Sequence, residues 1–216
     1  ASLFNAIELN ATHYDVPDAE KANKWYAAAQ REGFMFCPKL HKSISHLGNV
    51  DTHKFGQTKQ FIDSVSHFKE KLGTSFLQLP EKTGIGDKEK ILAYLQLLPQ
   101  AFALSVEFRN PDWFANENRL DAFVKEFHLL NKGLVITDTP GRRDAVHMKL
   151  SNTTAFVRFV CRGDHELDMF RIDQWQKQLK SWFWQGLERC YFFLHIHNAE
   201  FEDDFIAYVK EGVGKC

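Results

Sequence analysis

The sequence predicts an α/β fold in which a parallel sheet of seven strands is wrapped by helices. Short runs rich in β-branched and aromatic residues alternate with longer segments that have helical periodicity, and neighbouring runs start about 20 to 40 residues apart. No Ser/Gly/Pro tract, block of like charge or repeat of fixed period interrupts the chain. We therefore expect one domain over residues 1–216.

The predicted strands share one further property, which is a polar or charged side chain within an otherwise apolar run. They cover residues 5–10, 34–40, 75–80, 103–109, 134–138, 155–160 and 190–197. Parallel strands are buried on both faces and are normally continuous apolar runs. The polar residues therefore need a separate explanation.

The predicted helices follow from apolar residues at helical spacing. The clearest covers residues 52–72, where Phe61, Val65, Phe68 and Leu72 recur at i, i+4, i+7 and i+11. Others are expected at 19–31 after Asp18, at 87–100, at 118–130 and at 202–209. Ile172, Trp175, Leu179 and Trp182 mark one more, which Asp173 is expected to start. Helical periodicity is weak between residues 138 and 155, so that crossover is expected to be short or irregular.

Composition excludes several classes of protein. The 27 basic and 28 acidic residues give a net charge of -1, which argues against a strongly basic nucleic-acid-binding domain. No apolar run approaches the roughly 18 residues of a membrane span, and the N-terminal residues do not resemble a signal peptide. Four widely spaced cysteines, with no C-x-x-C pair, favour reduced thiols and a cytoplasmic location. They also suggest no metal site and no cofactor.

The carboxyl ends of the strands are the expected position of a functional site, because barrels and doubly wound sheets both place their sites there. Alternation along a strand puts Glu8 and Asn10 on one face, and likewise Glu107 and Arg109. The other strand ends supply Lys39, Gln78, Asp138, Arg158 and His195. A structural network of paired charges is one interpretation. We favour a functional pocket, because burying so many charges is costly unless a ligand or water uses them.

Two residues outside the strands are weaker candidates. His46 follows the second strand and could act as a general base or as a donor to an anion, although a surface loop histidine is an equally common case. Trp113 follows a strand end and could form the wall of a pocket. The chain has no Walker loop, G-x-S-x-G, H-E-x-x-H or G-x-G-x-x-G motif.

Several stretches together resemble one known family. Residues 4–14 (FNAIELNATHY) are similar to the FNTVEINSTFY stretch of the YecE-like family, catalogued as domain of unknown function 72. Further matches follow in order at 33–39 with 44–46, and then at the stretches LQLP (77–80), VEFRNPDW (106–113), LVITD (134–138) and FVRF (156–159). They cover the chain nearly end to end, and the Glu-Phe-Arg-x-Pro-x-Trp string is specific.

The resemblance implies a TIM-barrel-like parallel β/α barrel and little about activity. Two departures from the family pattern affect the interpretation. Family members usually begin with a strand rich in glycine and tryptophan before the Glu8 strand, so we expect a barrel with seven strands in which that first strand is absent. Many members have paired asparagines at the last strand, where this chain has His195.

Two classes of function fit these residues. The first is an enzyme, such as a hydrolase or an isomerase, that acts on an anionic or phosphorylated substrate. Lys39, Arg109 and Arg158 would hold this substrate. Glu8, Glu107 or Asp138 would act as the general acid or base. In a metal-dependent alternative, analogous to endonuclease IV and sugar isomerases, these three carboxylates and His195 would be the metal ligands. In the second, a non-catalytic protein binds a phosphometabolite or nucleic acid. We expect an anion rather than a divalent metal, because three cations compete for the three carboxylates.

Overall fold

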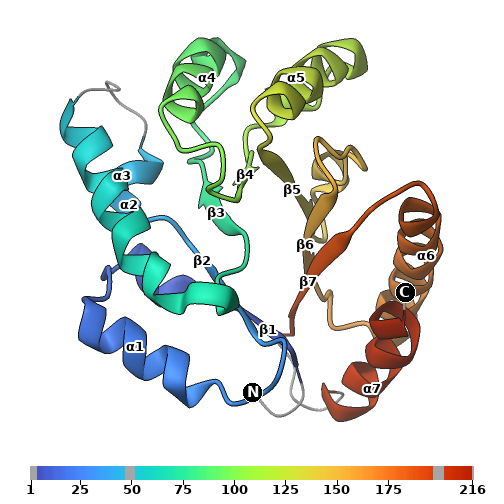
Figure 1. Cartoon of the computed structure of the whole chain (residues 1–216). Coiled ribbons are helices and arrows are strands. Elements are labelled where there is room, and N and C mark those ends of the chain that lie inside the picture. Colours follow the sequence, from blue (N-terminus) through green and yellow to red (C-terminus); the bar gives the residue numbers. More distant parts are fainter. Residues whose placement is uncertain (1–3, 47–51, 197–201, 216) are drawn as a thin grey trace.

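A computed structural model describes residues 4–46, 52–196 and 202–215, and it contains all seven predicted strands in the predicted order (Figure 1). Most are shorter than predicted. They are β1 (Ala6–Leu9), β2 (Met35–Pro38), β3 (Ser75–Gln78), β4 (Leu104–Glu107), β5 (Gly133–Asp138), β6 (Thr154–Val160) and β7 (Arg189–His195). Residues 197–201 lie outside the described residues, and His197 from the predicted last strand is among them.

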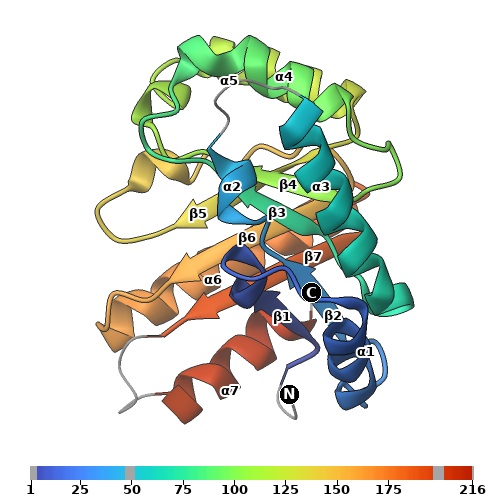
Figure 2. The ribbon, with the colours of Figure 1, turned by 90° about the vertical axis from the view of Figure 1, so that its left-hand side faces the viewer.

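All described strand pairs are parallel, as predicted. β3 to β7 form one five-stranded sheet in consecutive order, and β1 pairs with β2. Two isolated bridges, Phe36 with Leu72 and Lys39 with Phe76, connect the β1–β2 pair to the larger sheet. β7 contacts β1, as Figures 1 and 2 show, but the described residues form no strand pairing there. The described strands therefore form a curled parallel arrangement, and no ladder among them closes it into a seven-stranded barrel.

Helices surround the strands on the outside (Figure 1). They are α1 (Ala19–Ala28), α2 (Lys42–Ser45), α3 (Thr52–Val65), α4 (Lys88–Gln96), α5 (Glu117–Leu129), α6 (His165–Trp184) and α7 (Glu202–Gly212). The crossover between β5 and β6 holds only the 3₁₀ turn Arg143–Ala145 in addition to irregular chain, as the weak periodicity predicts. No helix in the described part of the chain is long and apolar enough to cross a membrane.

The largest differences from the predicted helices are at the end of α3 and the start of α6, and α1 and α4 also end three or four residues earlier than predicted. The segment 52–72 is not one helix: α3 ends at Val65, and the following 3₁₀ segment Ser66–Lys71 contains Lys69 at φ 49°. The last long helix starts earlier than Asp173, because Asp164 caps it by accepting a hydrogen bond from the Leu167 N–H. Asp173 lies inside α6 and accepts a hydrogen bond from the Tyr208 hydroxyl.

The strands bury both faces, which produces two kinds of core. Outward side chains pack against the helices in two large clusters, and inward side chains form a third cluster inside the curled sheet. The buried members of the inner cluster are Cys37, Phe76, Val135, Phe156, Tyr191 and Phe193. Inward residues alternate along each strand, so the next inward position after this aromatic layer lies at the carboxyl ends.

The inner packing also explains one glycine. A Cβ atom at Gly133, the first residue of β5, would lie 2.3 Å from the Ser105 Oγ on β4. A side chain at that position would require the Ser105 side chain or the strands themselves to shift. Cys37 and Cys161 are buried and form no disulfide, and Cys216 lies outside the described residues.

Candidate functional site

Five charged or polar side chains meet above the inner aromatic cluster, at the carboxyl ends of the strands. They are Glu8 from β1, Lys39 directly after β2, Gln78 from β3, Glu107 from β4 and Arg158 from β6. We call them the mouth cluster. Alternation predicts this convergence, because each residue lies two positions beyond an inward residue of the same strand, such as Phe76 before Gln78 and Phe156 before Arg158. All five are residues that the sequence identified.

Arg158 is the centre of the mouth cluster. Its Nε and Nη2 donate hydrogen bonds to the two carboxylate oxygens of Glu8 at 2.8 and 2.9 Å, and its Nη1 donates to Glu107 Oε2 at 2.9 Å. The side chains of Glu8 and Glu107 are 5% and 2% exposed. One guanidinium therefore satisfies two buried carboxylates from different strands, using the bidentate geometry that arginine favours.

Gln78 connects this ion-pair network to Lys39. Gln78 Nε2 donates to both oxygens of Glu107 at 3.0 Å, and its Oε1 accepts from Lys39 Nζ at 2.9 Å. The ring of Phe76 lies beneath both cations, 5.8 Å from Lys39 Nζ and 5.6 Å from the Arg158 guanidinium carbon. The Lys39 ammonium thus contacts a neutral amide and an aromatic ring. Gln78 lies between it and the Glu107 carboxylate and hydrogen-bonds to both.

Asn10 and His195 lie at the edge of the mouth cluster, beside Glu8. Asn10 Nδ2 donates to Glu8 Oε1 at 2.9 Å. His195 Nε2 lies 3.3 Å from Glu8 Oε2, which is within ion-pair range when the ring is protonated, although this nitrogen has no well-aligned hydrogen-bond partner. Seven of the candidate residues are therefore joined in one connected arrangement.

The charges of the mouth cluster shift the pKa values of its members. Burial alone would raise the pKa of Glu8, but the contacts with His195 and Arg158 outweigh it and lower this pKa to about 2. Burial, together with the charge of Arg158, lowers the pKa of Lys39. Burial would lower the pKa of Arg158, but Glu107 and Glu8 raise it. Glu8 is consequently an ionised carboxylate at neutral pH and a poor general acid.

Arg109 does not take the position that alternation predicts. β4 ends at Glu107, and the chain then turns at Asn110 and Pro111, so the two-residue period no longer applies. Arg109 is exposed, and its side chain has no hydrogen bond or ion pair with the described residues. Its charge still acts on Lys39, whose pKa it helps to lower. The predicted placement of Arg109 in the mouth on the same face as Glu107 is therefore not seen, whereas Glu107 does pair with a charged residue of another strand, Arg158.

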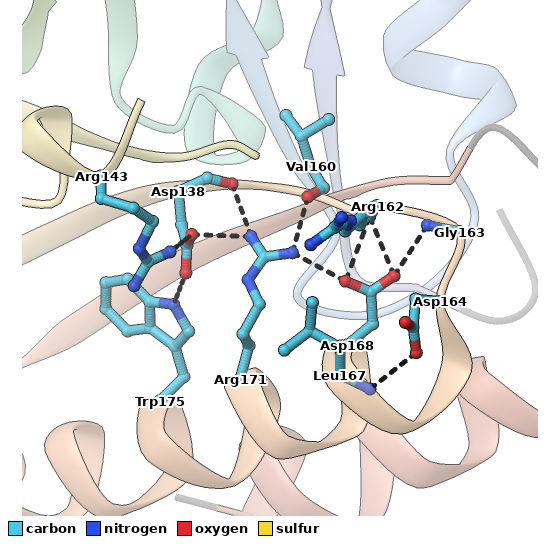
Figure 3. Close-up of polar contacts among 10 residues, drawn as sticks. All are labelled: Asp138, Arg143, Val160, Arg162, Gly163, Asp164, Leu167, Asp168, Arg171 and Trp175. Carbon is cyan, nitrogen blue, oxygen red and sulfur yellow. Dashed lines mark hydrogen bonds and ion pairs between the residues drawn. The ribbon is translucent and has the colours of Figure 1, made fainter. Parts of the chain in front are cut away.

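Asp138 lies on the opposite face of the sheet from the mouth cluster. β5 and β6 pair Thr137 with inward-facing Arg158, so Asp138 points outward to α6. Its Oδ1 accepts from Arg171 Nη2 at 2.6 Å and also contacts Arg143, and its Oδ2 accepts from Trp175 Nε1 at 2.7 Å (Figure 3). Its assignment to the mouth is therefore wrong, and its environment is a buried ion-pair cluster.

Trp113 and His46 also lie away from the mouth cluster. Trp113 is buried among Phe108 and Phe123, and its Nε1 donates to the Thr83 carbonyl at 2.9 Å, so it is a core residue. His46 is exposed after α2, and its Nδ1 contacts the Lys42 carbonyl oxygen at 3.0 Å. Neither side chain contacts a member of the mouth cluster.

Arg171 and Asp168, which form the buried ion-pair cluster with Asp138, were not identified from the sequence. Arg171 follows Asp168 by three residues on the helix and pairs with it at 2.7 Å. This i, i+3 spacing of an acid and a base is the sequence feature that could have indicated the pair. Thr137 is the inward residue of β5, and its buried Oγ1 has no hydrogen-bond partner. Nothing in the apolar run of β5 distinguishes which of its residues face inward.

The alternative metal site is not assembled. Glu8, Glu107 and His195 lie in or beside the mouth cluster, whereas Asp138 lies on the other face of the sheet. In the part of the chain that the structure describes, no group of three or more His, Cys, Asp or Glu side chains has an arrangement that could hold a metal ion.

Comparison with known proteins shows the family to which this chain belongs. The chain is 27% identical over 213 residues to the UPF0759 protein YecE of Escherichia coli (strain K12), which covers 90% of this chain and 77% of the relative. The protein of the same name from Escherichia coli O157:H7 gives the same values. Two crystal structures of a DUF72 family protein from Enterococcus faecalis V583 have the same fold. Their TM-scores are 0.79 and 0.77, at 16% and 17% identity, and they cover 99% and 97% of this chain and 91% and 85% of the neighbour.

A match to a family model confirms the family resemblance that the sequence motifs indicated. Residues 1–213 match the family described as "Protein of unknown function DUF72". Since this match extends over nearly the entire chain, the protein belongs to the DUF72 family.

Proposed function

We propose that this protein binds a small anionic or phosphorylated ligand at the carboxyl ends of its strands, with Lys39 and Arg109 as the groups that contact the anion. One observation carries the proposal. Arg158 already satisfies both buried carboxylates of the mouth cluster, whereas Lys39 Nζ has only the Gln78 amide as a hydrogen-bond partner and Arg109 has no side-chain partner among the described residues.

The charge balance supports the same ligand. Lys39, Arg109 and Arg158 carry three positive charges, and Glu8 and Glu107 carry two negative charges, which leaves one positive charge near the mouth. A phosphate or carboxylate would neutralise it and would raise the lowered pKa of Lys39. In this proposal Glu8, Arg158 and Glu107 form the frame that holds the strands together, and Lys39 and Arg109 form the ligand-binding part.

We also propose that the fold is TIM-barrel-like in its finer arrangement. The parallel strands follow one another in sequence order, their inward residues form an aromatic layer below a polar layer, and helices lie outside. That architecture places ligands at the carboxyl ends of the strands, where the mouth cluster lies.

Titration with inorganic phosphate, with chloride at matched ionic strength as the reference, tests the binding proposal. The melting temperature of the wild type should rise with phosphate beyond the chloride effect, because a ligand at ten times its Kd stabilises the folded state by about 1.4 kcal/mol. The Lys39→Met and Arg109→Met double variant should lose most of this rise. Arg119→Met is the matched control, since Arg119 is an exposed arginine on α5.

Two results would overturn the proposal. One is a phosphate response that is as large in the double variant as in the Arg119→Met control. The other is a melting temperature that phosphate leaves unchanged but that manganese or zinc raises. If Glu107→Gln abolishes that metal response, the metal-dependent alternative is correct.

A further inference from the structure

A pocket lies away from the mouth cluster, on the helix side of the sheet. Its volume is about 760 Å³, which is in the range of small-molecule sites. Three arginines line it: Arg143 follows β5, Arg162 follows β6, and Arg171 belongs to α6. Figure 3 shows these residues in a row beside the first turns of α6. The described lining contains no acidic side chain, and it includes no member of the mouth cluster.

Buried carboxylates behind the pocket hold its arginines in place. Arg171 is only 9% exposed, and it is held by Asp138 and Asp168 and stacked over the Phe159 ring at 4.1 Å. Asp168 also accepts the backbone N–H of Arg162 at 2.9 Å, which fixes the loop after β6 against α6. Arg171 Nε is buried without a hydrogen-bond partner.

Arg143 and Arg162, the two more exposed arginines of the pocket, have guanidinium N–H donors that are not hydrogen-bonded to any described residue. Arg143 contacts Asp138 through one nitrogen, and its side chain is 62% exposed. The Arg162 guanidinium is exposed, and the described residues offer it no hydrogen bond or ion pair. Two guanidinium groups at one pocket are suited to a phosphate, whose oxygens accept paired N–H donors.

The rest of the lining is apolar. Phe170 is a large hydrophobic side chain on α6 that is 59% exposed at this pocket, and Leu167 and Pro140 lie beside it. An exposed aromatic ring next to unsatisfied arginines matches a ligand with a planar ring and a phosphate, since the ring can stack while the phosphate is held.

We propose that this arginine pocket, lined by Arg143, Arg162, Arg171, Leu167, Phe170 and Pro140, binds an aromatic organic phosphate of the nucleoside monophosphate class. The site is independent of the mouth cluster: Lys39 and Arg109 lie outside its lining. Arg162 and Arg143 hold the phosphate, Arg171 provides a fixed positive charge behind it, and Phe170 stacks on the planar ring.

Calorimetric titration with adenosine 5′-monophosphate, adenosine and inorganic phosphate tests this site. The monophosphate should bind saturably and more tightly than either fragment. Arg162→Gln should weaken its binding about tenfold or more, the effect of losing a charge-assisted bidentate contact. Phe170→Ala should weaken binding of the monophosphate but leave phosphate binding unchanged. Arg119→Gln on α5 serves as the exposed-arginine control.

The outcomes separate this site from the mouth. Monophosphate binding that is unchanged in Lys39→Met and Arg109→Met but reduced in Arg162→Gln supports the arginine pocket. Equal affinity in Arg162→Gln and Arg119→Gln would overturn the inference, as would the absence of saturable binding at millimolar concentrations. Binding that is lost only in the mouth variants would assign the nucleotide to the mouth cluster instead.

Discussion

Replacement of Arg158 by Met should destabilise the protein more than any other single change in the mouth cluster. The variant keeps an unbranched side chain but leaves the Glu8 and Glu107 carboxylates, 5% and 2% exposed, without their cation. Removing one partner of a buried ion pair costs about 3–5 kcal/mol. Against the effect of burial, His195 and Arg158 together lower the pKa of Glu8 from 4.5 to about 2, which corresponds to about 3 kcal/mol.

Urea-induced unfolding, followed by circular dichroism at pH 7 and at pH 5, measures this loss. The deficit of the Arg158→Met variant should shrink as the pH falls. Burial opposes ionisation of Glu8, and without the guanidinium only His195 of the two contacts that lower its pKa remains, so the carboxyl group takes up a proton at a higher pH than in the wild type. In the wild type the same group remains ionised at both pH values.

Two further variants separate the effect of charge from that of volume. Combining Arg158→Met with Glu8→Gln and Glu107→Gln should restore most of the stability, because no buried charge remains unpaired. Arg119→Met, at an exposed position, should change the free energy of unfolding by less than about 0.5 kcal/mol. A loss below about 1 kcal/mol at pH 7, or a loss that is equal at both pH values, would refute the reasoning.

Three other predictions concern stability. The lowered pKa of Glu8 contributes stability that is fully present above pH 4.5 and is lost as the pH falls to about 2. If the free energy of unfolding falls equally steeply with pH in Glu8→Gln and in the wild type over this range, the prediction is wrong. Asp138→Asn leaves the buried Arg171 with one carboxylate instead of two, and urea unfolding should show a loss of about 2–3 kcal/mol, whereas an unchanged midpoint would be inconsistent with the contacts seen. Gly133→Ala should cost about 1–3 kcal/mol, because the new Cβ would meet Ser105 Oγ at 2.3 Å. Thermal melts should show partial recovery when Ser105→Ala is added, and a stable Gly133→Ala variant would argue against the close approach.

The strand order was predictable because each strand is a short apolar run followed by helical periodicity. Strand lengths were less predictable. β4 ends at Glu107 rather than at Arg109, because a 3₁₀ turn begins after Asn110. The Asn110 side chain caps this turn, and its Oδ1 accepts a hydrogen bond from the Asp112 N–H at 2.9 Å. Such a side-chain contact depends on the path of the chain, which apolar patterning does not report.

The site was predictable where polar residues interrupt a run, as Glu8, Gln78 and Arg158 do. It was not predictable for β5, since Thr137 and Asp138 are both polar and adjacent, and either could face inward. The register with β6 decides the matter by placing Thr137 opposite Arg158. Because both faces of a parallel sheet are buried, hydrophobicity does not identify the inner face.

The absence of strand pairing between β1 and β7 among the described residues has a consequence for the order in which the molecule folds. The bidentate contact between Glu8 and Arg158 joins residues 150 positions apart, and the backbone pairing that connects the β1–β2 pair to the larger sheet consists of isolated bridges rather than a continuous ladder. Contacts between residues so distant in sequence carry a large loop-closure entropy, so they form late. Stopped-flow kinetics of Glu8→Gln should therefore show faster unfolding with a nearly unchanged folding rate, which would make this contact a determinant of how long the native state persists rather than of how quickly it is reached.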